Sequence, residues 1–264
     1  MTDTPPRPGF ASAFVPTFGR AIRNAIPGRK AFVLIVVLLL PPLLTLPVLD
    51  REPDVRGQAL VTILLFLFLQ FLAPVVGLLF GTGVLLDESS GGTLPFLLTR
   101  PGRRSGILLG KVAAALVVGS AALSASLGAT LLLSSGSDAP EGIGLRAFTA
   151  VLVAFPAYLA LFALLSTFTR WAILGGFLYA FGLEGFLGFV PGMVRKTTVL
   201  YYSRSLLGEW EIKDLTMGLA LGKAGGAGTA TSILVLVGVA VVALSIACAV
   251  TARKGFAGRN PGRG

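Results

Sequence analysis

Few side chains in this sequence of 264 residues are suited to acid–base, nucleophilic or metal chemistry. The chain has no histidine, the commonest general base and metal ligand in proteins, and Cys248 is its one cysteine. An intrachain disulfide, a thiolate metal cluster and a Ser-His-Asp triad are therefore excluded. Glu184 is the candidate that remains, because it is the one acidic residue within a long apolar segment.

A carboxylate inside a membrane is costly and marks a functional site by default. Three roles are open for Glu184: binding substrate, relaying a proton, or holding the loop that follows through Arg195 or Lys196. We favour the last of these, a structural role in which Glu184 pairs with or caps groups beneath that loop.

Composition identifies the environment in which Glu184 must be held. Hydrophobic residues make up 54% of the chain and charged residues 13%, and the mean hydropathy is +0.85. A soluble domain carries about 25% charged residues, whereas a helix that crosses a bilayer needs about 20 apolar residues. We therefore predict an all-α, polytopic membrane protein with six transmembrane helices, at residues 31–49, 59–86, 107–133, 145–168, 171–190 and 229–251. The transmembrane domain is then 31–252, between basic tails at 1–30 and 253–264.

The formal net charge is +10, and the distribution of the basic residues along the chain predicts how this domain is oriented in the membrane. In a soluble protein such an excess suggests nucleic acid, but membrane proteins gather positive charge on their cytosolic side. With six spans both termini lie on the same side of the membrane, and that side holds 14 of the 22 basic residues. Five are in the N-terminal tail, four follow the second span (Arg100, Arg103, Arg104 and Lys111), one is Arg170, and four are in the C-terminal tail. We expect both termini in the cytosol, a bacterial plasma membrane around the spans, and no nucleic-acid partner.

The N-terminal tail contains a helical pattern. Phe14, Phe18, Ile22 and Ile26 recur every four residues and form an apolar stripe on a helix, with arginines off the stripe. This pattern is typical of a helix that lies in the headgroup region before the first span. A disordered basic tail is the alternative.

Prolines and glycines shape the first two spans. Pro41, Pro42 and Pro47 interrupt the first span, and we expect neighbouring helices to satisfy the carbonyl groups that they leave free. A signal peptide is the alternative, but the apolar run is long and no small-residue cleavage site follows it. In the second span, Gly77 and Gly81 form a GxxxG pattern, which permits another helix to approach closely.

The stretch from Asp87 to Lys111 is the most distinctive in the chain. Thr93 can cap a short helix, an apolar run of leucines and Phe96 follows it, and basic residues come next. Two interpretations are equally consistent with this pattern. The leucines anchor in a groove of a partner protein while the arginines pair with its carboxylates, or the stretch is an amphipathic loop on the lipid surface.

The same stretch resembles the cytosolic segment of ABC-2-type ABC transporter permeases, which are six-span exporter subunits. The residues that carry the resemblance are an acidic residue followed by Gly92-Thr93-Leu94, the core Leu97-Leu98-Thr99-Arg100-Pro101, and the closing Arg104-Ser105, Ile107-Leu108 and Gly110-Lys111. The region around Tyr179, Glu184-Gly185 and Pro191-Gly192 is similar to a subgroup of that family.

The resemblance implies that this segment is a coupling helix, which docks onto a separate ATP-binding subunit. The residues to which it assigns this docking are Glu88, Thr93, Leu94, Leu97, Leu98, Thr99, Arg100, Pro101 and Arg104. Pro95 departs from the family pattern, which more often has a helix-favouring residue there. The resemblance also implies short re-entrant helices in the loop before the last span.

We therefore predict a permease subunit that pairs with a second copy or a similar permease and exports substrate when separate ATPase subunits hydrolyse ATP. The chain itself is then no enzyme and needs no cofactor or metal, and its glycine-rich stretch 222–228 lacks the spacing of a phosphate-binding loop. The alternatives are an ATP-independent secondary transporter and a non-transporting membrane anchor. A single intramembrane acid and the lack of an internal repeat argue against the first alternative.

Overall fold

The computed structural model describes residues 10–25, 29–90, 104–169, 171–187, 196–208 and 226–253, and every regular element in these ranges is a helix. The elements are α1 (Phe10–Ala25), α2 (Arg29–Thr45), η1 (Leu46–Val48), α3 (Pro53–Thr62), η2 (Ile63–Leu72), α4 (Ala73–Ser90), α6 (Arg104–Leu133), α7 (Ile143–Phe168), α8 (Ala172–Phe177), η3 (Leu178–Leu183), α9 (Glu184–Leu187), α10 (Val199–Leu207) and α12 (Thr229–Arg253). The prediction of an all-helical chain with membrane-spanning helices is confirmed.

Four helical stretches in the described part of the chain are long and apolar enough to cross a membrane: Pro53–Gly83, Gly106–Leu133, Ile143–Phe168 and Thr229–Ala252. Two further apolar helices are shorter, Phe32–Val48 and Ala172–Leu187. They lie where the sequence predicts the first and fifth spans, and the predicted fifth span extends into residues outside the described ranges. Helix length and composition thus support four of the six predicted spans.

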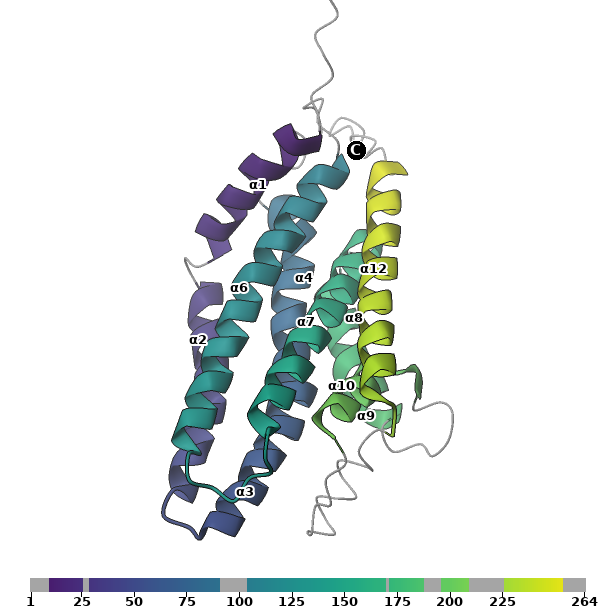
Figure 1. Ribbon diagram of the computed structural model, residues 1–264. Coiled ribbons are helices and arrows are strands. Elements are labelled where there is room, and N and C mark those ends of the chain that lie inside the picture. The colour runs from purple at the N-terminus through teal and green to yellow at the C-terminus, as the bar shows by residue number, and fades with distance from the viewer. Residues whose placement is uncertain are drawn as a thin grey trace, which may run out of the picture.

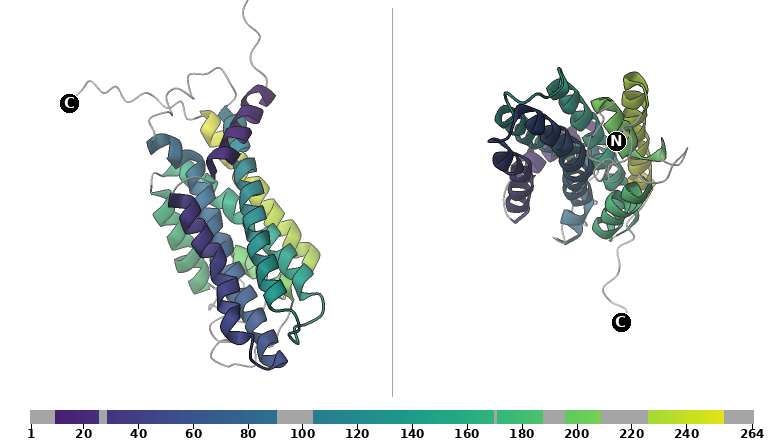
Figure 2. Two further views of the ribbon diagram at one scale, coloured as in Figure 1. Left: turned by 90° about the vertical axis from the view of Figure 1, so that its left-hand side faces the viewer. Right: turned by 90° about the horizontal axis from the view of Figure 1, so that it is seen from below.

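The long helices lie side by side in one bundle (Figures 1 and 2). Helix α1, the start of α6 and the C-terminal end of α12 lie at one end of the bundle, and α3 and the loop between α6 and α7 lie at the other. Seen from below in Figure 2, α2 and α12 occupy opposite edges. We refer to the end that contains α1 as the α1 end and to the other as the α3 end.

Helices α4 and α7 pack closely because glycines of α4 face α7. A Cβ atom on Gly77 would lie 2.9 Å from the Cβ of Tyr158, and one on Gly81 would lie 2.8 Å from the carbonyl oxygen of Leu159. No side chain fits at these distances without moving a helix backbone. The close approach predicted from the GxxxG pattern is confirmed, and α7 is the partner.

Helix α2 continues through Pro41 and Pro42, and a side chain of α6 bonds to a carbonyl group that the prolines leave free. Pro42 has no N–H group to donate to the carbonyl of Leu38, four residues earlier. Ser126 of α6 donates its hydroxyl to that carbonyl at 2.5 Å, and Thr45 donates to the carbonyl of Pro42 at 2.7 Å. The prediction that a neighbouring helix satisfies the carbonyl freed by proline is confirmed at this position.

Helix α1 packs on the first turns of α6. Gly110 of α6 lies against its backbone, since a Cβ atom there would be 3.0 Å from the carbonyl oxygen of Phe14 and 3.3 Å from the Cβ of Thr17. The rings of Phe14 and Phe18 stack with their centroids 6.0 Å apart. Arg20 is exposed. Part of the predicted apolar stripe is therefore covered by α6, and Ile26 lies outside the described residues.

Two segments are π-helical, which no pattern in the sequence indicates: η2 in the second predicted span and η3 in the fifth. A physical cause is present for η2, because Pro74 follows it, and a proline ring collides with the carbonyl four residues earlier in an α-helix. The wider turns of a π-helix relieve that collision. Rings from the two segments meet, with the centroids of Phe71 and Phe181 5.7 Å apart.

Candidate functional site

Glu184 lies at the junction of η3 and α9, and its side chain is buried, with 1% of its surface exposed. Its Oε2 accepts a hydrogen bond of 2.5 Å from the hydroxyl of Tyr158 on α7. Its Oε1 accepts bonds of 3.0 Å from the hydroxyl of Tyr179 and from the backbone N–H of Val199. Both carboxylate oxygens are thus held by donors from three different elements.

The bond from Val199 makes Glu184 a cap for α10, a helix that follows it by 15 residues in the chain. The first N–H groups of a helix have no partner within the helix and carry a partial positive charge. Glu184 satisfies the N–H of Val199, and the hydroxyl of Thr198 accepts from the N–H of Tyr201 at 3.2 Å. The start of α10 is therefore stabilised by one local side chain and one distant carboxylate.

Helix α10 lies in the loop where the family resemblance implies short re-entrant helices, and it is almost entirely buried. Its buried residues are Val199, Leu200, Ser203, Arg204, Ser205, Leu206 and Leu207. It packs against α7, α12 and η2, and Figure 1 shows it beside α12 toward the α3 end. Residues 199–207 are thus part of the core of the bundle.

Arg204 contributes a positive charge to the same region, with 4% of its side-chain surface exposed. Its Nη2 donates to Oε1 of Gln70 on η2. Glu184 and Arg204 are thus both attached to α10, one at its start and one further along. We call Gln70, Tyr158, Tyr179, Glu184 and Arg204 the polar cluster.

The sequence singles out Glu184, for which a structural role was favoured among three, but it does not indicate that the other members of the cluster lie beside it. Among the described residues, its donors are two tyrosine hydroxyls and a backbone N–H group. Of the predicted basic partners, Lys196 is exposed, and Arg195 lies outside the described residues. One signal in the sequence was available, since Arg204 interrupts the otherwise apolar stretch 199–207. A charge in such a stretch needs a buried partner.

Most of the predicted docking residues fall outside the part of the chain that the structure describes. Thr93, Leu94, Leu97, Leu98, Thr99, Arg100 and Pro101 lie outside the described residues. The backbone of Glu88 is in the last turns of α4, and Arg104 is the first residue of α6. The segment thus begins and ends on two neighbouring helices.

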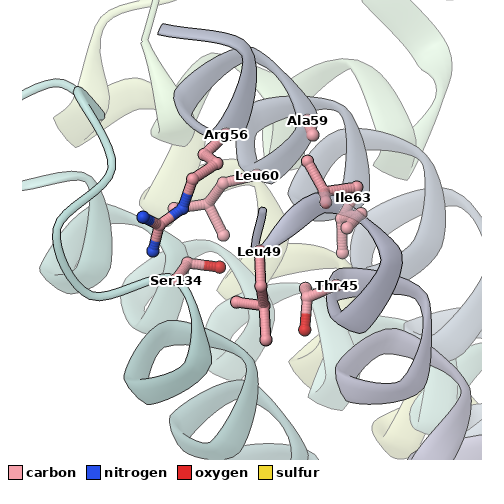
Figure 3. A pocket seen from close by; sticks show the side chains of 8 residues that line it. Thr45, Leu49, Arg56, Ala59, Leu60, Ile63 and Ser134 are labelled. Atoms are coloured by element: carbon pink, nitrogen blue, oxygen red, sulfur yellow. The ribbon is translucent and has the colours of Figure 1, made fainter. Parts of the chain in front are cut away.

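Among the described residues no group of histidine, cysteine and acidic side chains could hold a metal. A small pocket lies elsewhere, at the α3 end between α2, α3 and Ser134, where Arg56 points toward Ser134 (Figure 3). Its volume of about 10 Å³ matches the space that one water molecule needs. This pocket is too small for a transported molecule.

Comparison with known proteins identifies the class of this bundle. The model of the family described as ABC-2 family transporter protein matches residues 9–204, from α1 to Arg204 in α10. The chain belongs to this family. It is therefore an ABC-2 permease, an integral membrane component of a transporter and not itself a catalytic subunit. No curated protein matches the permease.

The family match covers three-quarters of the chain and includes the polar cluster as well as the GxxxG contact. Permeases of this family generally work with an ABC ATPase subunit. The resemblance inferred from the stretch 87–111 is confirmed at the level of the family. The role of individual residues in that stretch stays a prediction.

Proposed function

We propose that this permease forms the translocation path of an ATP-driven exporter and is driven by a separate ATPase subunit. The observation that carries the proposal is the family match over residues 9–204. Its apolar helices and the absence of histidine from the sequence agree with a protein that moves a molecule without transforming it.

The ATPase docks, in this proposal, on the segment between α4 and α6. The coupling residues assigned from the resemblance are Glu88, Thr93, Leu94, Leu97, Leu98, Thr99, Arg100, Pro101 and Arg104. The α1 end carries Arg20, Arg23 and Lys111, so the excess of positive charge supports a cytosolic location for this end. Both termini then lie in the cytosol, and the spans cross a bacterial plasma membrane.

The two shorter apolar helices complete six spans. Residues 32–48 and 172–187 have exposed apolar side chains, among them Phe32, Leu39, Phe177 and Phe186. In a bilayer such side chains face lipid or another membrane helix. A second copy of the permease, or a similar permease, completes the path against this bundle, and α1 lies in the cytosolic headgroup region.

Transport then proceeds by alternating access, in which ATP-driven closure of the ATPase subunits moves the coupling segments and the spans around the path. The polar cluster serves as an internal anchor for α10 near the α3 end, which is the outer end in this orientation. Three donors already occupy the Glu184 carboxylate, which supports the structural role for this residue over substrate binding or proton relay.

Co-expression with an ABC ATPase encoded next to the permease tests the proposal. We expect the wild-type permease to co-purify with that ATPase, and the double variant Arg100→Glu, Arg104→Glu to insert at normal yield without retaining it. Arg259→Glu, in the basic C-terminal tail, is the matched control and should retain the ATPase. Retention by the double variant at normal yield would contradict docking at this segment.

A further inference from the structure

Helix α1 has one face against α6 and one face exposed. Phe14, Thr17 and Phe18 lie on the covered side, because a Cβ atom at Gly110 of α6 would approach each of them to within 3.4 Å. The exposed residues recur every three to four positions, which is the spacing of one helix face: they are Val15, Pro16, Gly19, Arg20 and Arg23. Part of the apolar stripe of α1 therefore contacts protein, and the exposed face carries both arginines of the helix.

The point at which α1 meets α6 lies at the edge of the membrane. Along α6, a rise of about 1.5 Å per residue puts Gly110 about 35 Å from Leu133, the last residue of this helix. The hydrocarbon core of a bilayer is about 30 Å thick, and the headgroups extend this to about 40–45 Å. A usual tilt of about 20° shortens the 35 Å to about 32 Å. With Leu133 at the far boundary of the core, the contact with α1 therefore lies in the headgroup layer.

The helix that follows α1 supports this placement. Both α1 and α2 pack against α6, and Figure 1 shows them one after the other along the same side of it. Apolar side chains of α2 are exposed from Phe32 onward, among them Val36 and Leu39. Arg20 and Arg23 lie in the half of α1 that leads into α2. The two arginines are therefore close to the level at which the lipid-facing surface of α2 begins.

The charges of this region are all of one sign on the three helices that form it. The sequences of α1, α2 and α6 contain no acidic residue, and their basic residues are Arg20, Arg23, Arg29, Lys30, Arg104 and Lys111. An anion is therefore the complementary ligand of the exposed arginines. In the headgroup layer that anion is a lipid phosphate, which a guanidinium binds through two parallel N–H bonds.

We propose that the exposed face of α1 is a binding surface for anionic phospholipid, with Arg20 and Arg23 on the lipid headgroups. Charge then holds α1 at the membrane surface, while α6 covers part of its apolar stripe. The proposal rests on the headgroup location given to α1 in the proposed function and adds the class of lipid and the residues that select it. Each arginine should raise the local concentration of anionic lipid about fivefold.

A fluorophore on the exposed face of α1 tests the proposal in the full-length permease. Gly19 is exposed and a side chain there meets open space, so Gly19→Cys accepts a label, and Cys248→Ser removes the one native cysteine. The labelled permease is placed in phosphatidylcholine nanodiscs. These contain a small fraction of lipid with a quenching doxyl group near the headgroup, either phosphatidylglycerol or phosphatidylcholine. We expect the doxyl-labelled phosphatidylglycerol to quench several times more strongly.

Substitution of the arginines should remove this preference. Arg20→Gln or Arg23→Gln alone should lower the ratio of the two quenching efficiencies by up to about fivefold, and the two together should bring it close to one. Raised salt should lower the ratio in the wild type, because it screens exposed charges. Arg51→Gln with Lys196→Gln is the matched control, since both residues are exposed and lie outside α1, and it should keep the wild-type ratio. Quenching by doxyl-labelled phosphatidylcholine should be the same in every variant, which shows that α1 is still in place.

The possible outcomes are distinct. Equal quenching by the two lipids in the wild type would overturn the proposal, and so would an unchanged ratio in the double arginine variant. Loss of quenching by both lipids when an ABC ATPase is added would overturn it in favour of a protein contact at this face. A permease that binds no ATPase would overturn the proposed function instead, and the quenching ratio would still decide whether the arginines bind anionic lipid.

Discussion

The hydroxyl of Tyr158 lies 2.5 Å from Oε2 of Glu184 and joins α7 to the short helix α9. Tyr158 is fully buried, and its Cβ is also the atom that a side chain at Gly77 would strike. Tyr158 thus lies against α4 with its Cβ and bonds to Glu184 with its hydroxyl. This relationship links the close packing of α4 and α7 to the attachment of α10.

The first prediction concerns the charge of Glu184. Glu184→Gln places an NH₂ group where a carboxylate oxygen accepts from a donor, so at least one donor loses its partner. We expect stability to fall by about 1–3 kcal/mol, the cost of an unsatisfied buried polar group. The measurement is the thermal unfolding temperature in detergent, with Glu141→Gln on the exposed loop as the control. Equal unfolding temperatures for the two variants would rule out an anchoring role.

The second prediction concerns the proline-containing part of α2. Ser126→Ala removes the donor to the Leu38 carbonyl. We expect a loss of about 0.5–1.5 kcal/mol, in the range of hydrogen bonds between membrane helices. Ser245→Ala is the control, because that hydroxyl bonds to Val241 within its own helix and faces outward. A smaller loss for Ser126→Ala than for the control, in denaturant titrations, would count against the interhelical bond.

The third prediction concerns the contact of α4 with α7. An alanine at Gly81 puts a Cβ atom 2.8 Å from the Leu159 carbonyl oxygen, so the helices must separate. We expect a destabilisation of about 1–3 kcal/mol, as for other overpacked positions. Gly128→Ala in α6 is the control, since its Cβ meets open space, and it should stabilise by up to about 1 kcal/mol. The two substitutions should therefore change stability in opposite directions, which the unfolding temperatures measure. A stabilising Gly81→Ala would contradict the close packing of α4 and α7.

The fourth prediction concerns the attachment of α1. Gly110→Val places a branched side chain against the backbone of Phe14, at an initial Cβ distance of 3.0 Å, and should displace α1 from α6. Trypsin should then cleave at Arg20 and Arg23 several times faster than in the wild type. Gly19→Val, where a Cβ meets open space, adds the same residue type to α1 without displacing it. Equally fast cleavage of both variants would attribute the effect to helix propensity alone.

Features that depend on neighbouring residues were predictable from the sequence. The class of the protein follows from runs of apolar residues, because each span satisfies its own backbone hydrogen bonds. The helix boundaries near Leu133, Phe168 and Thr229 follow from local changes in polarity. The close approach at Gly77 and Gly81 was predictable too, since it needs only the absence of side chains on one helix face.

Features that depend on distant residues were decided by the tertiary structure. Tyr158 and Glu184 are 26 positions apart, and Gln70 and Arg204 are 134 apart. No periodicity in the sequence pairs such residues, because the pairing arises only when the helices pack and each buried polar group must find a partner. From the sequence alone, the chain resembles an ABC-2-type permease with one acidic residue inside a predicted span. The packed bundle decided that this acid holds α10, because the free N–H groups of a buried helix need an acceptor that its own turns do not supply.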